Sequence, residues 1–300
     1  MRITTQMLYT TFNYKLQNTM NDVYTTDQQL ATGQKLNKPS DDPAAVSSIS
    51  YQKSQLSSIA GYQDTIGNIS TLLNATSSVL DNLKSLISSA KQIGNNAMSA
   101  TASDLATYAS MIDNVINGAV SAANTKVGDK YIFSGYGTDQ PAVASATGTL
   151  TATATADLIP MQIDVGASVN VNVTANGFIA SGTAQDTTTI IGAMQALKAA
   201  IQANSQAGIQ TAMTALDSLS GRVMSTQSDV GVRLNRLSIE KDYLTSRDTD
   251  VTNSVSDKMM LSTVDIARLS ALSQQQQAAL TSLRTITNGV LNTSLFDFLK

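Results

Sequence analysis

The chain of 300 residues contains no cysteine, no histidine and no tryptophan. The lack of cysteine and histidine excludes thiol nucleophiles, zinc sites of the Cys/His type and acid/base catalysis by imidazole. Disulfides are excluded too, which suits a protein that is exported unfolded. Aromatic residues make up 5% and charged residues 14% of the chain, both low for a compact enzyme with a large core. We therefore expect no enzyme, and neither catalytic residues, cofactors nor metal sites.

Basic clusters and long apolar runs are also missing. The net charge is −3, with no run of Lys and Arg, so nucleic acid is excluded as a main partner because phosphate neutralisation needs a basic patch. No apolar run approaches the roughly 20 residues that a membrane span needs. The first residues lack the apolar core and cleavage site of a secretory signal. We expect no membrane partner, and any export to leave the N-terminus uncut.

What the chain does have is an apolar repeat of alternating three- and four-residue steps. Between Ile59 and Ala90, nine of ten positions in this register are apolar or aromatic, which predicts a coiled-coil helix. Residues 105–122 continue the pattern, and we expect this helix to run antiparallel to the first after a short turn formed by Asn95, Asn96 and the polar stretch 101–104. Seven-residue spacing from Leu216 to Val251 predicts a long return helix, preceded by a shorter one over 190–201.

Both ends of the chain carry amphipathic helical patterns with few charges. Two interpretations are open: the two helices pack on each other as an intrachain hairpin, or they stay unpaired until copies or neighbours associate, which we favour. In either case their apolar residues are our candidates for contacts between subunits. These candidates are Phe12, Leu16, Val23, Leu30, Leu269, Leu272, Leu283, Ile286, Val290, Phe296 and Phe298.

The middle of the chain, residues 131–188, is different in kind. It is rich in Thr, Ala, Gly and Val, and apolar residues alternate with other residues around Ile163 and Val171, which predicts half-buried strands. Asn176-Gly177 is a dipeptide typical of hairpin turns. The fold class we predict is mainly α: an elongated, discontinuous rod of helical coiled coil and bundle with a small inserted β-rich domain.

We expect three parts, two of them discontinuous. Residues 1–44 and 256–300 form the terminal helices of an inner coiled-coil layer. Residues 45–130 and 189–255 form a helical bundle, and residues 131–188 form the inserted outer domain.

The stretch LATGQKLNKPSDDPAAV, residues 30–46, joins the first helix to the second. Gly33 is placed to end the first helix, and Pro39 forces the residue before it to be extended. Asp42 is the expected N-cap and Pro43 the first residue of the next helix. The alternative interpretation is that Asp41 and Asp42 form a catalytic pair, but the side chains of adjacent residues rarely point into one site. We therefore interpret the segment as a hinge with a helix cap.

The same stretch resembles the N-terminal signature of the flagellin superfamily. Its Pro-Ser-Asp-Asp-Pro form, residues 39–43, is more similar to the hook–filament junction family, hook-associated protein 3, than to filament flagellin. KYIFSG at 130–135 and SLFDFL at 294–299 are similar to motifs of the superfamily, as is VGVRLN at 230–235. Only the β-rich insertion carries no recognisable signature.

The resemblance implies a structural protein of the bacterial flagellum that is exported by the flagellar type III apparatus without signal cleavage. It implies an extracellular position at the hook–filament junction, as a ring of copies between hook-associated protein 1 and flagellin. An export chaperone would hold the C-terminal helix beforehand. Two alternatives stay open: a short flagellin that forms the filament itself, and a tip protein of a virulence secretion system.

Overall fold

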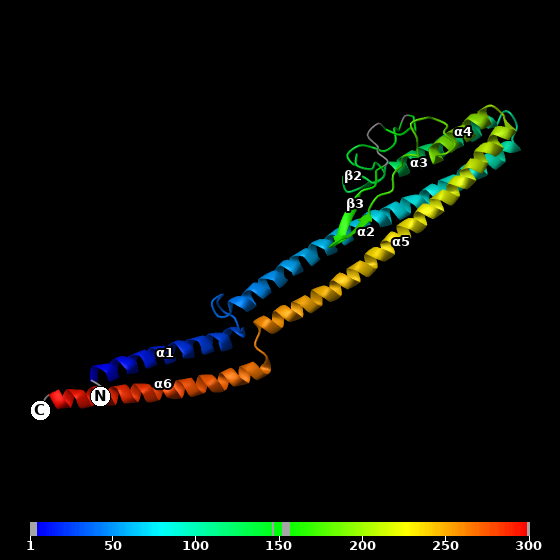
Figure 1. Cartoon of the computed structure of the whole chain (residues 1–300). Coiled ribbons are helices and arrows are strands. Elements are labelled where there is room, and N and C mark those ends of the chain that lie inside the picture. The colour runs from blue at the N-terminus through cyan, green and yellow to red at the C-terminus, as the bar shows by residue number, and fades with distance from the viewer. Residues whose placement is uncertain (1–4, 146, 152–156, 299–300) are drawn as a thin grey trace. The chain divides into compact units, whose positions relative to one another are not determined.

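The computed structural model describes residues 5–145, 147–151 and 157–298, with side chains at Met7 and over 10–286 of these (Figure 1). Its helices are α1 (Thr5–Thr32), α2 (Pro43–Met98), α3 (Leu105–Ala123), α4 (Ile190–Gln202), α5 (Gln206–Met259) and α6 (Thr263–Phe298). The strands are β1 (Lys126–Val127), β2 (Lys130–Tyr131), β3 (Pro160–Asp164) and β4 (Ala167–Asn170). The prediction of a mainly α fold with a small inserted β part is confirmed.

The chain divides into two compact units. Unit 1 contains Met1–Ser58 and Ser246–Lys300, and unit 2 contains Ile59–Thr245. The long helices α2 and α5 contribute residues to both. The predicted division at 44/45 and 255/256 concerns layers in an assembly, and it stays a prediction.

Unit 2 holds the apolar core of the described chain. Seam residues of α2 and α5 such as Leu73, Leu80, Leu216 and Leu237 are completely buried, as the seven-residue spacing predicts. Thr76, the one polar position of the α2 seam, is equally buried. Its hydroxyl donates to the carbonyl oxygen of Leu72 at 2.9 Å, so the polar group is satisfied inside its own helix.

The turn between α2 and α3 includes the predicted stretch 101–104 but not Asn95 and Asn96. Helix α2 continues through Asn95 and Asn96 to Met98, and the turn occupies residues 99–104. The carbonyl of Asn96 accepts a hydrogen bond from the N–H of Ser99 at 3.2 Å, which tightens the last turn of α2. The following helix packs back on α2, where Gly118 of α3 faces Leu86 of α2.

Among the described residues, β1 and β2 form an antiparallel pair where the insertion begins, and β3 and β4 form a second antiparallel pair within it. Ile163 of β3 and Val169 of β4 are buried and belong to the same apolar cluster as the helices. The chain turns at Asn176-Gly177 as predicted, but no hairpin forms there, because Asn176 and Ala180 pair in a parallel bridge. The antiparallel strands β3 and β4 are connected by Val165 and Gly166, with Gly166 at φ +78°. Gly177 also has a positive φ, but its N–H donates to the carbonyl of Ala180 in a local turn.

Two arginines of α5 hold the insertion against the helix. Arg233 donates from Nη1 to the carbonyl oxygens of Asn170 and Asn172, both at 3.1 Å. Arg222 donates to the carbonyl oxygens of Thr188 at 2.9 Å and Gly177 at 3.0 Å. Four backbone carbonyls at the edge of the insertion are therefore satisfied by the helix.

The helix surfaces are polar mainly through hydroxyl groups that bond to their own backbone. Thr11, Ser85 and Thr245 are examples, each donating to the carbonyl four residues earlier at 2.8–3.0 Å. Ion pairs are few: within the described residues, three Lys–Asp pairs are present, at Lys35, Lys91 and Lys198. In that part of the chain no helix is long and apolar enough to cross a membrane.

Candidate functional site: the terminal helix pair and its joint

Helices α1 and α6 of unit 1 pack along each other (Figure 1). The structure therefore has the intrachain hairpin, which is one of the two interpretations that the sequence left open. The interpretation that we favoured, unpaired ends, is not what the structure has. The function of this pair depends on what it leaves uncovered.

The contact between α1 and α6 is unusually polar at its most buried positions. Thr26 is 5% exposed and Ser273 is 6% exposed. The hydroxyl of Ser273 donates to Oδ1 of Asp27 at 2.8 Å, and Nε2 of Gln277 donates to the Ser273 hydroxyl at 3.3 Å. A hydrogen bond between Ser273 and Asp27 therefore joins the two helices, and the most buried side chains of the seam are polar.

The interface candidates from the sequence occupy this seam and its edges without being fully buried. Leu272 is 39% exposed and Ile286 is 47% exposed. Six others are half-buried: Phe12, Leu16, Val23, Leu30, Leu269 and Leu283. Val290, Phe296 and Phe298 belong to α6, but their side chains lie outside the described residues. Apolar side chains on both helices therefore remain in contact with water.

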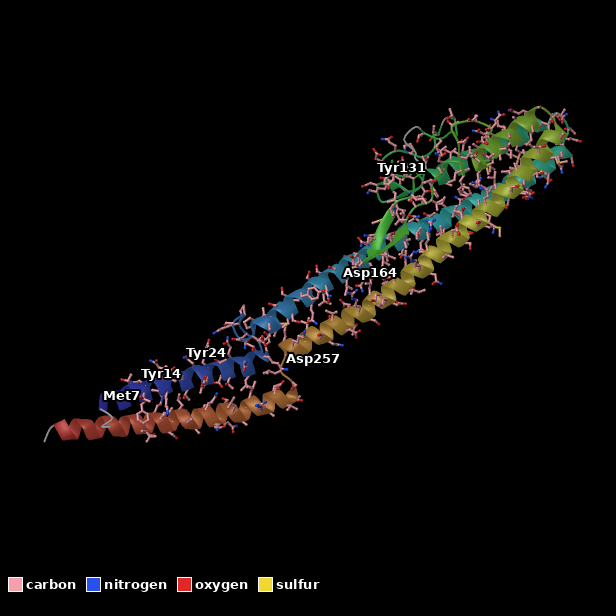
Figure 2. The ribbon with its side chains drawn as sticks, in the orientation of Figure 1. Met7, Tyr14, Tyr24, Tyr131, Asp164 and Asp257 are labelled. Carbon is pink, nitrogen blue, oxygen red and sulfur yellow. The ribbon has the colours of Figure 1, made fainter. Side chains whose placement is uncertain are left out.

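Three exposed apolar side chains on α1 are ones that we did not predict. Met7, Tyr14 and Tyr24, labelled in Figure 2, are 64–66% exposed. Met7 and Tyr14 are seven residues apart, and at 100° per residue they lie on the side of α1 opposite the seam of Phe12 and Leu16. The seven-residue spacing of Met7 and Tyr14 is the sequence feature that could have identified these two.

Residues 33–42 connect α1 to α2 and contain the predicted hinge and cap residues. Gly33 has φ +68°, and its N–H donates to the carbonyl of Gln29 at 2.9 Å, which closes α1. Asp42 accepts at Oδ1 from the N–H groups of Ala44 and Ala45 at 3.0–3.1 Å. It therefore caps α2, whose first residue is Pro43.

The neighbouring carboxylate, Asp41, bonds to the loop before α2 and not to α2 itself. Asp41 accepts at Oδ2 from the backbone N–H groups of Asn37 and Lys38 at 2.8–3.0 Å, and these residues flank Pro39 upstream. Asp41 therefore holds the loop, while Asp42 holds the helix. The two carboxylates do not form a joint site, and no metal-binding group of three or more acidic side chains occurs within the described part of the chain.

The connection from α5 to α6, residues 260–262, is hydrogen-bonded to the connection from α1 to α2. The N–H of Lys35 donates to the carbonyl of Met259 at 2.7 Å, and the N–H of Leu261 donates to the carbonyl of Gly33 at 2.9 Å. Gln34 and Met260 form an antiparallel bridge between them. We call these two connections, residues 33–42 and 260–262, the joint.

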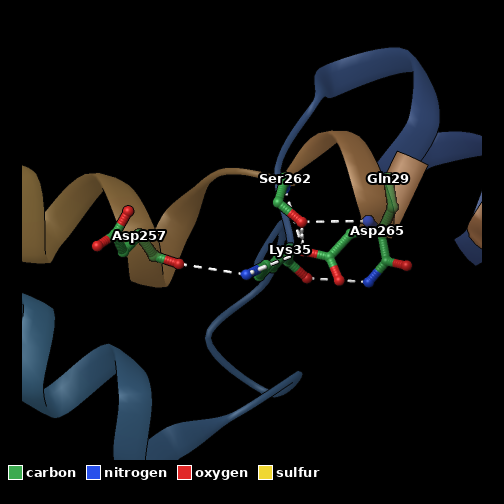
Figure 3. A network of polar contacts seen from close by, with 5 residues as sticks. All are labelled: Gln29, Lys35, Asp257, Ser262 and Asp265. Carbon is green, nitrogen blue, oxygen red and sulfur yellow. Dashed lines mark hydrogen bonds and ion pairs between the residues drawn. The ribbon is translucent and has the colours of Figure 1, made fainter. Parts of the chain in front are cut away.

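Side chains reinforce the joint around Lys35 (Figure 3). Its Nζ forms an ion pair with Oδ2 of Asp265 at 3.1 Å and donates to the carbonyl of Asp257 at 3.3 Å. Nε2 of Gln29 donates to the carbonyl of Lys35 at 2.9 Å. One lysine therefore contacts α1, α5 and α6.

Ser262 and Asp265 cap the start of α6 reciprocally. The N–H and hydroxyl of Ser262 donate to Oδ2 of Asp265 at 3.1 and 2.8 Å, and the N–H of Asp265 donates to the Ser262 hydroxyl at 3.1 Å. These hydrogen bonds from Ser262, together with the ion pair to Lys35, lower the pKa of the Asp265 carboxyl from 3.8 to about 2. The carboxylate therefore stays ionised well into acid.

Comparisons with known proteins agree with this architecture. Residues 3–138 match the bacterial flagellin N-terminal helical region, so the resemblance to the flagellin superfamily is confirmed over that part of the chain. No curated protein matched the chain in a sequence comparison.

Solved structures share the fold at low sequence identity. A putative flagellar hook-associated protein from Vibrio parahaemolyticus is 22% identical with a TM-score of 0.66, over 73% of this chain and 100% of that one. FlgL from Bacillus cereus is 17% identical with a TM-score of 0.59, over 69% and 99%. Flagellar hook-associated protein 3 from Legionella pneumophila is 15% identical with a TM-score of 0.60, over 70% and 98%. The chain therefore has the fold of flagellar hook-associated proteins.

Proposed function

We propose that this chain is a structural component of the bacterial flagellum, an adaptor at the hook–filament junction that joins hook-associated protein 1 to flagellin. The observation that carries the proposal is the terminal helix pair, which has a polar seam and leaves apolar side chains on both helices exposed. The shared fold with hook-associated proteins supports the same assignment.

The driving force for assembly is the burial of these side chains. Burying apolar surface contributes roughly 25 cal/mol per Å², and the exposed side chains of α1 and α6 become buried when several copies and their neighbours pack together. Since α1 and α6 already pack along each other, each copy enters the assembly as a two-helix unit. The protein acts by shape and by surface matching, and not by chemistry.

The partners in this proposal are hook-associated protein 1 below, flagellin above, further copies of the chain in a ring, and an export chaperone before secretion. The site of action is extracellular, after export without signal cleavage. The terminal helices belong to the inner layer, and the insertion between α3 and α4 is directed outward.

The position of the protein on an intact flagellum tests the proposal. We expect a label on an exposed position of the insertion to mark one band directly above the hook. A label along the whole filament, or none on the flagellum, would contradict the junction assignment.

Truncation tests the role of the terminal helix pair. A chain that ends after Leu261 lacks α6, and we expect unit 2 to stay folded because its core lies between residues 59 and 244. Circular dichroism should show a cooperative unfolding transition, whereas cells with this chain should lack filaments and not swim. Normal swimming of those cells would refute the terminal-helix mechanism.

A short flagellin is the second candidate, and the match of residues 3–138 to the flagellin N-terminal region favours it. The two candidates differ in polymerisation. A flagellin polymerises by itself into long filaments, whereas a junction protein stops at monomers or short rings. Electron microscopy of the concentrated purified protein separates them.

A further inference from the structure

Unit 2 also carries an exposed apolar stripe, on the outside of α5. Val232, Ile239 and Tyr243 are 66%, 64% and 54% exposed. Val232 and Ile239 each follow a completely buried seam residue, Val230 and Leu237, by two positions. Two residues correspond to about 200° of helix rotation, so Val232 and Ile239 point away from α2. Three large apolar side chains in one row call for an explanation that the core does not give.

The outer face of α2 is built in the opposite way, from small and polar residues. Gly61 and Asn68 each follow a buried seam residue, Ile59 and Ile66, by two positions, and both are exposed. A Cβ added at Gly61 would meet no other atom within 4 Å. Glycine destabilises a helix interior relative to alanine, and no contact inside the chain requires it here.

The two outer faces carry charges of opposite sign in matching places, and Glu240 also lies on the α5 face. Arg236 stands between Val232 and Ile239 on α5, and Asp64 stands between Gly61 and Asn68 on α2. Both side chains are exposed, and neither has an ion-pair partner among the described residues. Each face thus presents an unpaired charge that the other face could neutralise.

The spacing of the two faces coincides when the helices are antiparallel. On the outer face of α2, Asp64 follows Gly61 by three residues, and Asn68 follows Asp64 by four. On the outer face of α5, Arg236 precedes Ile239 by three residues, and Val232 precedes Arg236 by four. One register therefore sets Ile239 on the open space at Gly61, Arg236 beside Asp64 and Val232 against Asn68.

Within one chain these faces cannot meet, because α2 and α5 turn their seams toward each other. Gln63 and Thr245, Asp81 and Gln227, and Lys91 and Asp217 bond across that seam. We infer that the α5 stripe of one copy packs on the outer face of α2 of a second copy of this chain, in the register defined by Arg236 and Asp64. Such a head-to-tail contact uses two different faces of each copy, and it closes into a ring if the rotation per copy allows.

This inference deepens the proposed function, on which it rests for the expectation that copies stand side by side. Because the natural chain has no cysteine, engineered cysteines test it cleanly. Ile239→Cys and Gly61→Cys variants, one carrying a mass tag, are mixed at high concentration and oxidised mildly. We expect a disulfide-linked dimer with one chain of each kind.

A matched control uses the same face of α2. Ser85→Cys is also exposed and also two residues beyond a buried seam position, Leu83, but it lies 24 residues, or roughly 36 Å, from Gly61. Mixed with Ile239→Cys, it should give no dimer. An equal yield from this control would overturn the proposed register, as would the absence of any dimer when both cysteines react with maleimide.

Charge exchange between copies gives a second readout. Adding Arg236→Asp to the Ile239→Cys chain should reduce the dimer yield about fivefold, since two carboxylates then face each other. Adding Asp64→Arg to the Gly61→Cys chain should restore it. Lys241→Asp, an exposed charge of α5 outside the stripe, should leave the yield unchanged. If Arg236→Asp did not reduce the dimer yield, or if Asp64→Arg did not restore it, the proposed contact would be contradicted.

The same cysteine variants separate this inference from the proposed function when they are expressed together in cells. Motile cells whose isolated flagella contain no mixed dimer would overturn the inference alone. A mixed dimer of purified protein, from a chain that is absent from flagella, would overturn the proposed function alone. A cross-link of Ile239→Cys to a different protein in flagella, without the mixed dimer, would show that the stripe binds another partner and would refute the inference.

Discussion

At the scale of single residues, Asp265 is the carboxylate on which the joint depends, since it accepts from Ser262 and pairs with Lys35. We expect Ser262→Ala to raise its pKa from about 2 toward 3.8, because the largest stabilisation of the ionised form comes from the Ser262 hydroxyl. Lys35→Gln should raise it less. Titration of the carboxyl followed by NMR measures both.

The pH dependence of the joint follows from the direction of this shift. The folded pKa lies below the unfolded one, so the contribution of Asp265 to stability is fully present above about pH 4. It is lost as the pH falls through about 2. An Asp265 pKa near 3.8 in the unaltered protein would show that the cap and ion pair do not form.

Asp42 acts on a single helix end. Replacing it with alanine should cost about 1 kcal/mol of local stability, so hydrogen exchange at Ala44 and Ala45 should be about fivefold faster. Asp42→Asn keeps an N-cap acceptor and should be nearly neutral. Asp41→Asn, one residue away, should leave exchange at these two amides unchanged because its bonds are to Asn37 and Lys38. Equal effects of Asp42→Ala and Asp41→Asn would contradict the assignment of the cap.

At the scale of elements, α6 should tolerate polar residues in folding but not in assembly. The double change Leu272→Ser and Ile286→Ser removes apolar side chains that are 39% and 47% exposed, so thermal unfolding should change little. Assembly and swimming should be lost if these side chains become buried between subunits. Ala267→Ser, an exposed control on the same helix, should change neither. Normal assembly of the double variant would remove Leu272 and Ile286 from the interface.

The helices of unit 2 could be predicted because their apolar period persists over many turns, and the buried seam from Ile59 to Ala90 follows it closely. The ends of the helices and the positions of the turns were harder to predict than the helices themselves. Asn95 and Asn96 favour turns by propensity, yet α2 continues to Met98 because Ala97 is buried against the core. Likewise, the dipeptide Asn176-Gly177 is typical of hairpin turns, but the antiparallel pair β3–β4 is connected at Gly166 instead.

The site was predictable only where its contacts are local. Gly33 and Asp42 act within a few residues of themselves, so turn and capping preferences point to them directly. The contact between Lys35 and Asp265 joins residues that are far apart in the sequence, and no local sequence pattern predicts it. The spacing of Ser262 and Asp265 is a capping-box pattern, which is a local signal for the start of α6.

At the scale of the whole molecule, the two units should differ in protection from hydrogen exchange. The described apolar cluster contains residues from Ile59 to Leu244 and none of α1 or α6. Amides of α2 and α5 near Leu80 and Leu237 should therefore exchange slowest, through global unfolding, while those of α1 and α6 exchange by local opening. Equal protection of Val23 and Leu80 in the unassembled protein would contradict this.

The self-bonded hydroxyls and scarce ion pairs have a consequence for the surroundings in which the protein works. Screening by dissolved salt weakens interactions between exposed charges, but it has little effect on a Thr or Ser hydroxyl that donates to its own helix. With three ion pairs among the described residues, the folded chain has little to lose as salinity changes. Its helices should keep the same packing in fresh water and in brine.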